Sequence, residues 1–324
     1  MISSLGGGTG SGLGSRLIEE FKDIFNDIQL INSVVFPNRS GETTLQHYNC
    51  VLSLAHLQSF SDCIIYFQND KINNYLSYSK SKTIDKSVDI TNINQYIASQ
   101  LHNLVRINDY STYNRFYFDL LMDTAPMPDF KFVELYSTPY YYDKQLSTNS
   151  QATWEKVMDT VSGQVNVEES YMTEGVNLGE KEDFEFQDLK NYRQTSKKNV
   201  SISVNTVFKS GDVSKSLQNQ TNLLKQVNQK IVNTFNPVSW NPDCCNNEFI
   251  EEKLKEGVDH KMMLSMANRS SIADIIKEIN DIGYNKFKAN AFLHWYYKYE
   301  LEKQDFQDAF VAMDNIIENY NSIK

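Results

Sequence analysis

The 324-residue chain has the hydrophobic and charged fractions of an ordinary globular protein, 40% and 22%, and is long enough for two compact domains. Its formal net charge of -10 argues against nucleic acid or an anionic membrane as a partner, because both are negatively charged. No apolar run reaches the length of a membrane span. The four cysteines and five histidines lack metal-ligand spacing, so we expect reduced thiols and no metal bound by these side chains.

The first twelve residues contain a glycine-rich loop, GGGTGSG, from Gly6 to Gly12. Glycine is unfavourable inside helices and strands and is kept where a chain turns tightly or approaches a ligand closely. A helical pattern follows directly, with apolar side chains at Leu13, Leu17, Ile18 and Phe21. The loop therefore leads into a helix N-terminus, whose free N–H groups and dipole attract phosphate. A purely structural turn is the alternative.

Two common phosphate-binding motifs do not fit this loop. Whether the dinucleotide-binding motif G-x-G-x-x-G is counted from Gly8 or from Gly10, its third glycine is missing. The Gly-Lys-Ser/Thr sequence of a P-loop does not follow either. The string GGGTGSG is instead the phosphate-loop signature of the tubulin family, which this chain resembles. The resemblance implies that the loop holds the phosphates of GTP or GDP through Gly6, Gly7, Gly8, Thr9, Gly10, Ser11 and Gly12.

Strands and helices alternate after this loop. The patterns predict a strand over 28–36, a helix over 45–57 and a second strand over 62–67. Such βαβ units form a parallel sheet, and ligands bind at the carboxyl ends of its strands. The glycine loop, the loop at Asn38 and Asn69 all fall at that edge.

The rest of the chain is predicted to continue with a helix over 91–106 and a strand over 130–135. Residues 143–198 are polar and are interpreted as a long surface insertion, partly disordered. Period-two alternation predicts a strand over 200–208. Helices are predicted over 214–233, 269–282 and 286–321.

Four further residues take nucleotide-binding roles through the resemblance. Taken alone, Asn69 and Asn94 are ordinary turn or cap residues. In tubulins, matching asparagines hold guanine, and an amide offers both the donor and the acceptor that this needs. Most tubulins have an aromatic residue that stacks on the base where this chain has Ile90, so the contact expected here is apolar. The acidic residue that usually contacts the ribose is Gln46 in this chain, so that contact is expected to be neutral.

A possible water-activating acid, Asp119, precedes the segment Pro126-Met127-Pro128. The resemblance places Asp119 where alpha-type tubulins carry the acid that activates water on the GTP of the neighbouring subunit. Asn114 matches an interface asparagine of the same loop. Aspartate is one methylene shorter than glutamate, which limits its reach, and the alternative is a solvated surface carboxylate.

The residues Ala291–Tyr296 and Glu302–Phe306 resemble the C-terminal helical hairpin of tubulins. The fold implied is α/β and tubulin/FtsZ-like: part of a parallel-sheet nucleotide-binding domain, an α+β intermediate domain and a C-terminal helical hairpin. The expected parts are 1–89 in the GTP-binding domain, 90–107 as a central helix, 108–262 as the intermediate domain and 263–324 as the helical domain. The sequence motif Arg39-Ser40-Gly41-Glu42 is most similar to that of the delta group within the family.

Compared with complete tubulins, the chain is expected to lack the N-terminal part of the GTPase domain. That part carries the elements through which magnesium is expected to bind. Its loss would leave an unpaired sheet edge and an exposed apolar face. The chain alone is therefore expected to bind GTP weakly and to be inactive.

The function implied by the resemblance is that of a GTP-binding cytoskeletal protein of centrioles or basal bodies, in the cytoplasm, that supports triplet microtubules and ciliogenesis. Its partners would be other tubulin subunits, through longitudinal contacts, and centriolar microtubules. Assembly-dependent GTP hydrolysis is implied for the intact protein. The alternatives are a non-hydrolysing scaffold component of a tubulin lattice and a divergent alpha- or epsilon-type subunit. An unrelated dinucleotide-binding oxidoreductase is disfavoured by the missing G-x-G-x-x-G motif.

Overall fold

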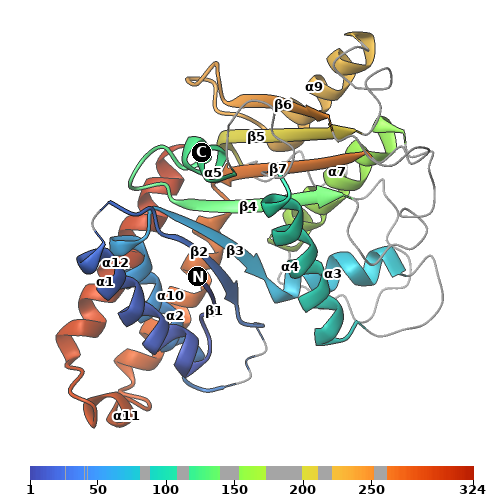
Figure 1. Cartoon of the computed structure of the whole chain (residues 1–324). Helices are drawn as coiled ribbons and strands as arrows, with labels where there is room; N and C mark the ends of the chain where they lie inside the picture. Colours follow the sequence, from blue (N-terminus) through green and yellow to red (C-terminus); the bar gives the residue numbers. More distant parts are fainter. Residues whose placement is uncertain are drawn as a thin grey trace. The chain divides into compact units, whose positions relative to one another are not determined.

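The computed structural model describes residues 1–25, 27–39, 41, 43–80, 88–107, 117–138, 153–172, 199–210, 221–251 and 261–324. It is an α/β structure that divides into two units (Figure 1). The first unit contains Met1–Asp70, Phe118–Leu135 and Asn268–Ile323, so the beginning and the end of the chain fold together. The second unit contains Lys71–Tyr117 and Tyr136–Ala267.

The sheet of the first unit is parallel. Its strands lie in the order β1 (Ile2–Ser4), β2 (Ile31–Phe36), β3 (Cys63–Gln68) and the first residues of β4 (Phe132–Thr138). In register, Val34 pairs with both Ser3 and Tyr66, and Ile64 pairs with Phe132. The three strands predicted in this region are confirmed, with small shifts at their ends. The short strand β1 carried too little pattern to be predicted.

Helices α1 (Gly14–Ile24), α2 (Gln46–Phe60), α10 (Ile272–Lys288) and α12 (Lys303–Ser322) belong to the first unit. Helix α2 packs against the other three (Figure 1). Helix α5 (Tyr117–Thr124) also lies almost entirely in this unit. The predicted helix over 45–57 is confirmed.

The predicted helix over 286–321 is wrong in its continuity. Helix α10 runs on to Lys288, a four-residue helix α11 (His294–Tyr297) follows, and α12 begins only at Lys303. Asn290 and Phe292 adopt positive φ angles of 51° and 60°, which end the first helix. The apolar pattern runs through this break, so periodicity alone could not reveal it.

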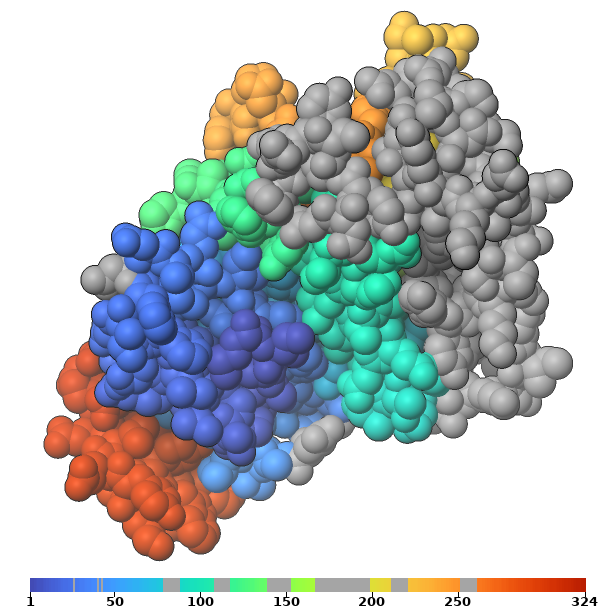
Figure 2. Space-filling view, in the orientation of Figure 1, coloured from blue at the N-terminus to red at the C-terminus, as the bar shows by residue number. Residues whose placement is uncertain are grey.

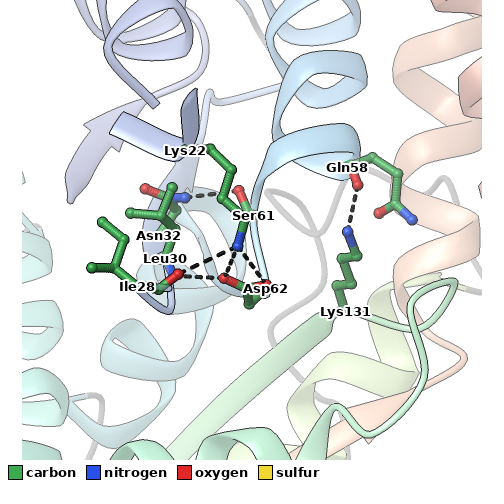
Figure 3. Close-up of polar contacts among 8 residues, drawn as sticks. All are labelled: Lys22, Ile28, Leu30, Asn32, Gln58, Ser61, Asp62 and Lys131. Atoms are coloured by element: carbon green, nitrogen blue, oxygen red, sulfur yellow. Dashed lines mark hydrogen bonds and ion pairs between the residues drawn. The ribbon is translucent and has the colours of Figure 1, made fainter. Parts of the chain in front are cut away.

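Asp62, just before β3, ties α1 to the start of β2 (Figure 3). Its carboxylate accepts hydrogen bonds from the Leu30 N–H at 2.7 Å and from Lys22 Nζ at 3.0 Å. Lys22 also donates to the Ile28 carbonyl at 3.3 Å. These contacts fix the amino ends of β2 and β3. The glycine loop follows β1 and therefore lies at the carboxyl-end edge of the parallel strands.

A buried polar network attaches the C-terminal helices to this sheet. Glu134 on β4 is 2% exposed and accepts hydrogen bonds from the Tyr66 hydroxyl and, at 3.0 Å, from Ser271 Oγ. Arg269, which is fully buried, places Nη1 3.5 Å from the other carboxylate oxygen. A buried carboxylate needs such partners, because an uncompensated charge in the interior is strongly destabilising.

The second unit has the strand order β7 (Met262–Arg269), β5 (Ser201–Ser210) and β6 (Cys245–Glu251). Asn268 and Arg269, at the end of β7, belong to the first unit. Its helices are α3 (Asn69–Lys80), α4 (Ile90–Val105), α7 (Trp154–Met172) and α9 (Thr221–Phe235), of which α3 begins in the first unit. The predicted strand over 200–208 and helix over 91–106 are confirmed. Of the helix predicted over 214–233, the part from Thr221 onward is confirmed as α9, and 211–220 lie outside the described residues.

Residues 143–198 are interpreted from the sequence as a polar surface insertion, and helix α7, which lies within this range, shows that the interpretation is wrong for its residues. Trp154, Val157, Met158, Val161 and Val165 are buried in the core of the second unit, with Phe208 and Ile231 among their neighbours. Their helical spacing is a core pattern that the polar residues between them concealed. The other residues of the range, except 153, lie outside the described residues.

One face of the first unit is open. The outer edge of β1 has no strand beside it within the described ranges, and apolar side chains on and near α1 are exposed. They include Ile2, Leu13, Phe21 and Ile24. The unpaired edge and the exposed apolar face are therefore as the sequence predicts. Among the helices described, none combines the length and hydrophobicity of a membrane span.

Two isoleucines of α1 give a matched test of this packing. Ile18 is 3% exposed and Ile24 is 65% exposed. Replacing Ile18 by alanine should lower the free energy of unfolding by about 2–4 kcal/mol, because it leaves a cavity. Ile24→Ala should change it by less than about 0.5 kcal/mol. Urea unfolding of both variants measures the difference, and equal losses would contradict the orientation of α1.

Candidate functional site

The glycine loop is anchored on both sides. Before it, the Leu5 N–H donates to the Val35 carbonyl at 3.1 Å, and Asn49 Nδ2 donates to the Gly6 carbonyl at 3.0 Å. After it, a short π-helix (Thr9–Leu13) runs directly into α1. A helix follows the loop, as predicted, but Gly10 and Gly12 lie inside the π-helix, where the sequence predicts a loop outside the helix. The glycine segment lies on the visible face of the molecule (dark blue in Figure 2).

The loop glycines divide into two groups. A Cβ atom on Gly10 would lie 2.6 Å from the Ser4 carbonyl oxygen, and one on Gly6 would lie 3.0 Å from Pro37 Cβ. Packing therefore requires glycine at position 10 and leaves little room for a side chain at position 6. Gly7, Gly8 and Gly12 face open space, since a Cβ there would meet no atom within 4 Å. None of the five has a positive φ, so turn geometry does not explain the open group.

Polar groups of the open part are available to a ligand. Gly7, Gly8 and Thr9 are exposed, and the first N–H groups of a helix have no intrahelical acceptor. Ser11 is used differently: its side chain is buried and its hydroxyl donates to the Gly7 carbonyl, which holds the turn closed. The arrangement can bind an anion through backbone N–H groups and the helix dipole.

Gln46 has a structural role in the neighbouring loop. Its side chain is 2% exposed, and Nε2 donates to the Asn38 carbonyl at 3.1 Å. Gly41, at a φ of 72°, packs against the same amide. The predicted ribose contact of Gln46 stays a prediction.

The proposed base-binding residues are described unit by unit. In the first unit, Asn69 directly follows β3 and is half-buried; among the described residues its side chain has no hydrogen-bond partner. In the second unit, Ile90 and Asn94 lie one turn apart on α4, and both are exposed, Ile90 by 50%. Asp89 caps this helix, with its carboxylate accepting the Ile90 N–H at 2.7 Å.

Asp119 lies half-buried in the first turn of α5. A carboxylate there also stabilises the helix through its dipole, so the position alone does not require catalysis. Asn114 lies outside the described residues. Among the described side chains, no cluster of three histidine, cysteine, aspartate or glutamate residues could hold a metal ion.

Sequence reasoning missed two contacts next to the loop. Tyr296 of α11 donates to Asn49 Oδ1 at 2.7 Å, and Lys286 Nζ lies 3.2 Å from His47 Nδ1. Burial, together with the positive charge of Lys286, lowers the pKa of His47 to about 4. A residue pair separated by 247 positions leaves no local pattern, so no sequence signal pointed to Tyr296.

The comparisons with known proteins agree with the sequence resemblance. Residues 1–77 match the model of the Tubulin/FtsZ family, GTPase domain. The chain is 25% identical to the tubulin delta chain of Homo sapiens over 99% of its own length and 69% of the human protein. It is 26% identical to that of Mus musculus over 100% and 70%. It is also 30% identical to the tubulin gamma chain of Saccharomyces cerevisiae, over 49% and 34%. The tubulin/FtsZ-like α/β fold class is confirmed.

The lowered pKa of His47 predicts a pH dependence of stability. Between pH 6.5 and about 4 the unfolded chain takes up a proton that folded His47 does not, so the free energy of unfolding falls as the pH drops through this window. His47→Gln should make that fall shallower. The control is His294→Gln, which replaces an exposed histidine and should leave the slope of this fall unchanged. Urea midpoints measured from pH 7 to pH 4 test this, and parallel curves for wild type and His47→Gln would contradict it.

Proposed function

Because this chain belongs to the tubulin family and is most like the delta chains among its groups, we propose that it is a cytoskeletal subunit that binds GTP or GDP at the loop Gly6–Gly12. The observation that carries the proposal is the open space at Gly7, Gly8 and Gly12, for which packing gives no reason. A phosphate chain fits there, since it needs close approach to backbone N–H groups and leaves no room for side chains.

In this proposal the loop residues have separate tasks. The N–H groups from Gly7 to Thr9 and the Thr9 hydroxyl donate to phosphate oxygens, while Ser11 holds the turn that presents them. The nucleotide supplies the phosphate chain and its hydrolysable γ-phosphate. Asn69 and Asn94 are proposed to recognise guanine, with Ile90 as apolar cover and Gln46 near the ribose. Magnesium is proposed to accompany the nucleotide.

Asp119 is proposed to act on a neighbouring subunit rather than on its own. Its carboxylate would orient a water molecule and accept its proton, a role that requires longitudinal contact with another tubulin subunit. The alternative function, a lattice component without hydrolysis, is favoured by two observations. The first turn of α5 explains Asp119 structurally, and Gln46 is neutral and buried.

The similarity to delta chains supports a finer proposal for the cellular role. We propose that the protein acts at centrioles or basal bodies, where it contributes to the assembly or stability of triplet microtubules and so to ciliogenesis. A divergent alpha- or epsilon-type microtubule subunit is the alternative within the family. Localisation of the tagged protein to centrioles or basal bodies, or to cytoplasmic microtubules instead, separates these two roles.

Gly8→Ala tests the phosphate site without disturbing the fold. The added methyl group meets no protein atom, so stability should be unchanged or slightly increased. Affinity for GTP should fall roughly tenfold or more, because each 1.4 kcal/mol of lost phosphate contact is tenfold in affinity. Titration calorimetry with GTP measures the change.

Two glycines provide the controls for this experiment. Gly163→Ala, at an equally open position in α7, should leave GTP affinity unchanged. Gly10→Ala should instead lower the unfolding free energy, by about 1–3 kcal/mol, because of its clash with Ser4. If wild type and Gly8→Ala bind GTP equally, the phosphate assignment is wrong.

Asp119→Asn separates hydrolysis from binding. In the intact protein, for which hydrolysis is implied, the variant should bind GTP like wild type but lose assembly-dependent hydrolysis by about 100-fold or more, because the base that accepts the proton of water is gone. Asp123→Asn, on the exposed side of the same helix, is the matched control. Hydrolysis whose rate per subunit does not rise with protein concentration would refute action across subunits. Absence of hydrolysis in assembled wild type would favour the lattice role.

A further inference from the structure

A chain of two hydrogen bonds links the C-terminal helices to the glycine loop. The Tyr296 hydroxyl donates to Asn49 Oδ1 at 2.7 Å, and Asn49 Nδ2 donates to the Gly6 carbonyl at 3.0 Å. All three residues belong to the first unit. Gly6 is the residue directly before the open glycines, so this bond acts on the beginning of the phosphate-binding segment.

The direction of both hydrogen bonds is determined by their chemistry. The Gly6 carbonyl can only accept, so the Asn49 amide must turn its NH₂ group toward it and its oxygen toward Tyr296. Burial, with smaller effects of Tyr48 and Cys50, raises the pKa of Tyr296, so its hydroxyl keeps its proton and donates. The Asn49 side chain therefore has one fitting orientation.

Packing holds Tyr296 in place independently of its hydroxyl. Its ring makes edge contacts with Tyr48 and Phe306, with centroids 5.7 and 5.3 Å apart. Tyr48 in turn donates its hydroxyl to the Ala291 carbonyl at 3.0 Å. A phenylalanine at 296 would keep these ring contacts and lose only the hydrogen bond to Asn49.

We propose that Tyr296 and Asn49 are positioning residues for the phosphate loop. Asn49 fixes the Gly6 carbonyl, and Tyr296 fixes the amide of Asn49, so that the N–H groups after Gly6 are held ready for phosphate. Preorganised donors bind more tightly because their ordering cost is already met. The inference rests on the proposed nucleotide-binding function and adds two residues, 247 positions apart, to its site.

The test is a double-mutant cycle in GTP affinity, measured by titration calorimetry on the full chain. Tyr296→Phe should weaken GTP binding about 3- to 10-fold, the range for one lost hydrogen bond, and Asn49→Ala should weaken it at least as much. The double variant should bind no more weakly than Asn49→Ala alone, because Tyr296 acts through Asn49. Urea unfolding of each variant confirms that binding is measured on folded protein.

Tyr299→Phe is the control, since its side chain is exposed and, among the described residues, its hydroxyl has no hydrogen-bond partner. It should bind GTP like wild type. If Tyr296→Phe binds GTP as tightly as Tyr299→Phe, or if the losses in the double variant multiply, the positioning role is overturned while the phosphate site stands. Because the chain alone is expected to bind GTP weakly, the titrations use a large excess of GTP. If wild type shows no binding under these conditions, the proposed function itself fails, and this inference fails with it. Should Asn49→Ala not fold, the comparison of the two tyrosine variants decides alone.

Discussion

The close approach of Gly10 to the backbone of Ser4 is the constraint on which the loop depends. Any side chain at position 10 would lie within 2.6 Å of the Ser4 carbonyl oxygen and 2.9 Å of its nitrogen. The helix can therefore begin directly against the strand that precedes it. This contact turns the chain between Gly6 and Gly10 outward, leaving Gly7 and Gly8 exposed at a helix N-terminus. Packing thus explains Gly10, whereas Gly7 and Gly8 belong to the proposed phosphate site.

The second constraint is electrostatic and lies beneath the C-terminal helices. The carboxylate of Glu134 is satisfied jointly by Tyr66 on β3, Ser271 before α10, and Arg269. Because a buried charge tolerates no loss of partners, this network fixes where α10 starts. Helix α10 packs against α2 and α12, and the connection between α10 and α12 carries Tyr296. The Tyr296 ring itself is held by its edge contacts with Tyr48 and Phe306.

The sequence predicts the parts of this structure that leave a local pattern. Glycine density before an apolar helical repeat was enough for the loop, and alternating elements were enough for the parallel sheet of the first unit. Helix α7 was missed because five buried residues are diluted by polar neighbours. The break before α12 was missed because it depends on backbone conformation at Phe292, which no periodicity reports. The sequence could not distinguish Gly10 from Gly8, because the contact of Gly10 with Ser4 depends on the three-dimensional structure.

The connection between α10 and α12 is strained, which bears on what the Tyr296 contact can transmit. Phe292 and Glu300 adopt positive φ angles of 60° and 67°, each at a cost of about 1–3 kcal/mol that the surroundings must overcome. The cluster of Tyr48, Tyr296 and Phe306 is the packing that holds the segment between them. If Tyr296 positions the phosphate loop as proposed, Asn49 is the side chain through which a shift at Gly6 would reach Tyr296. Linkage requires that any effect of the segment on phosphate binding is matched by an equal effect of phosphate on the segment.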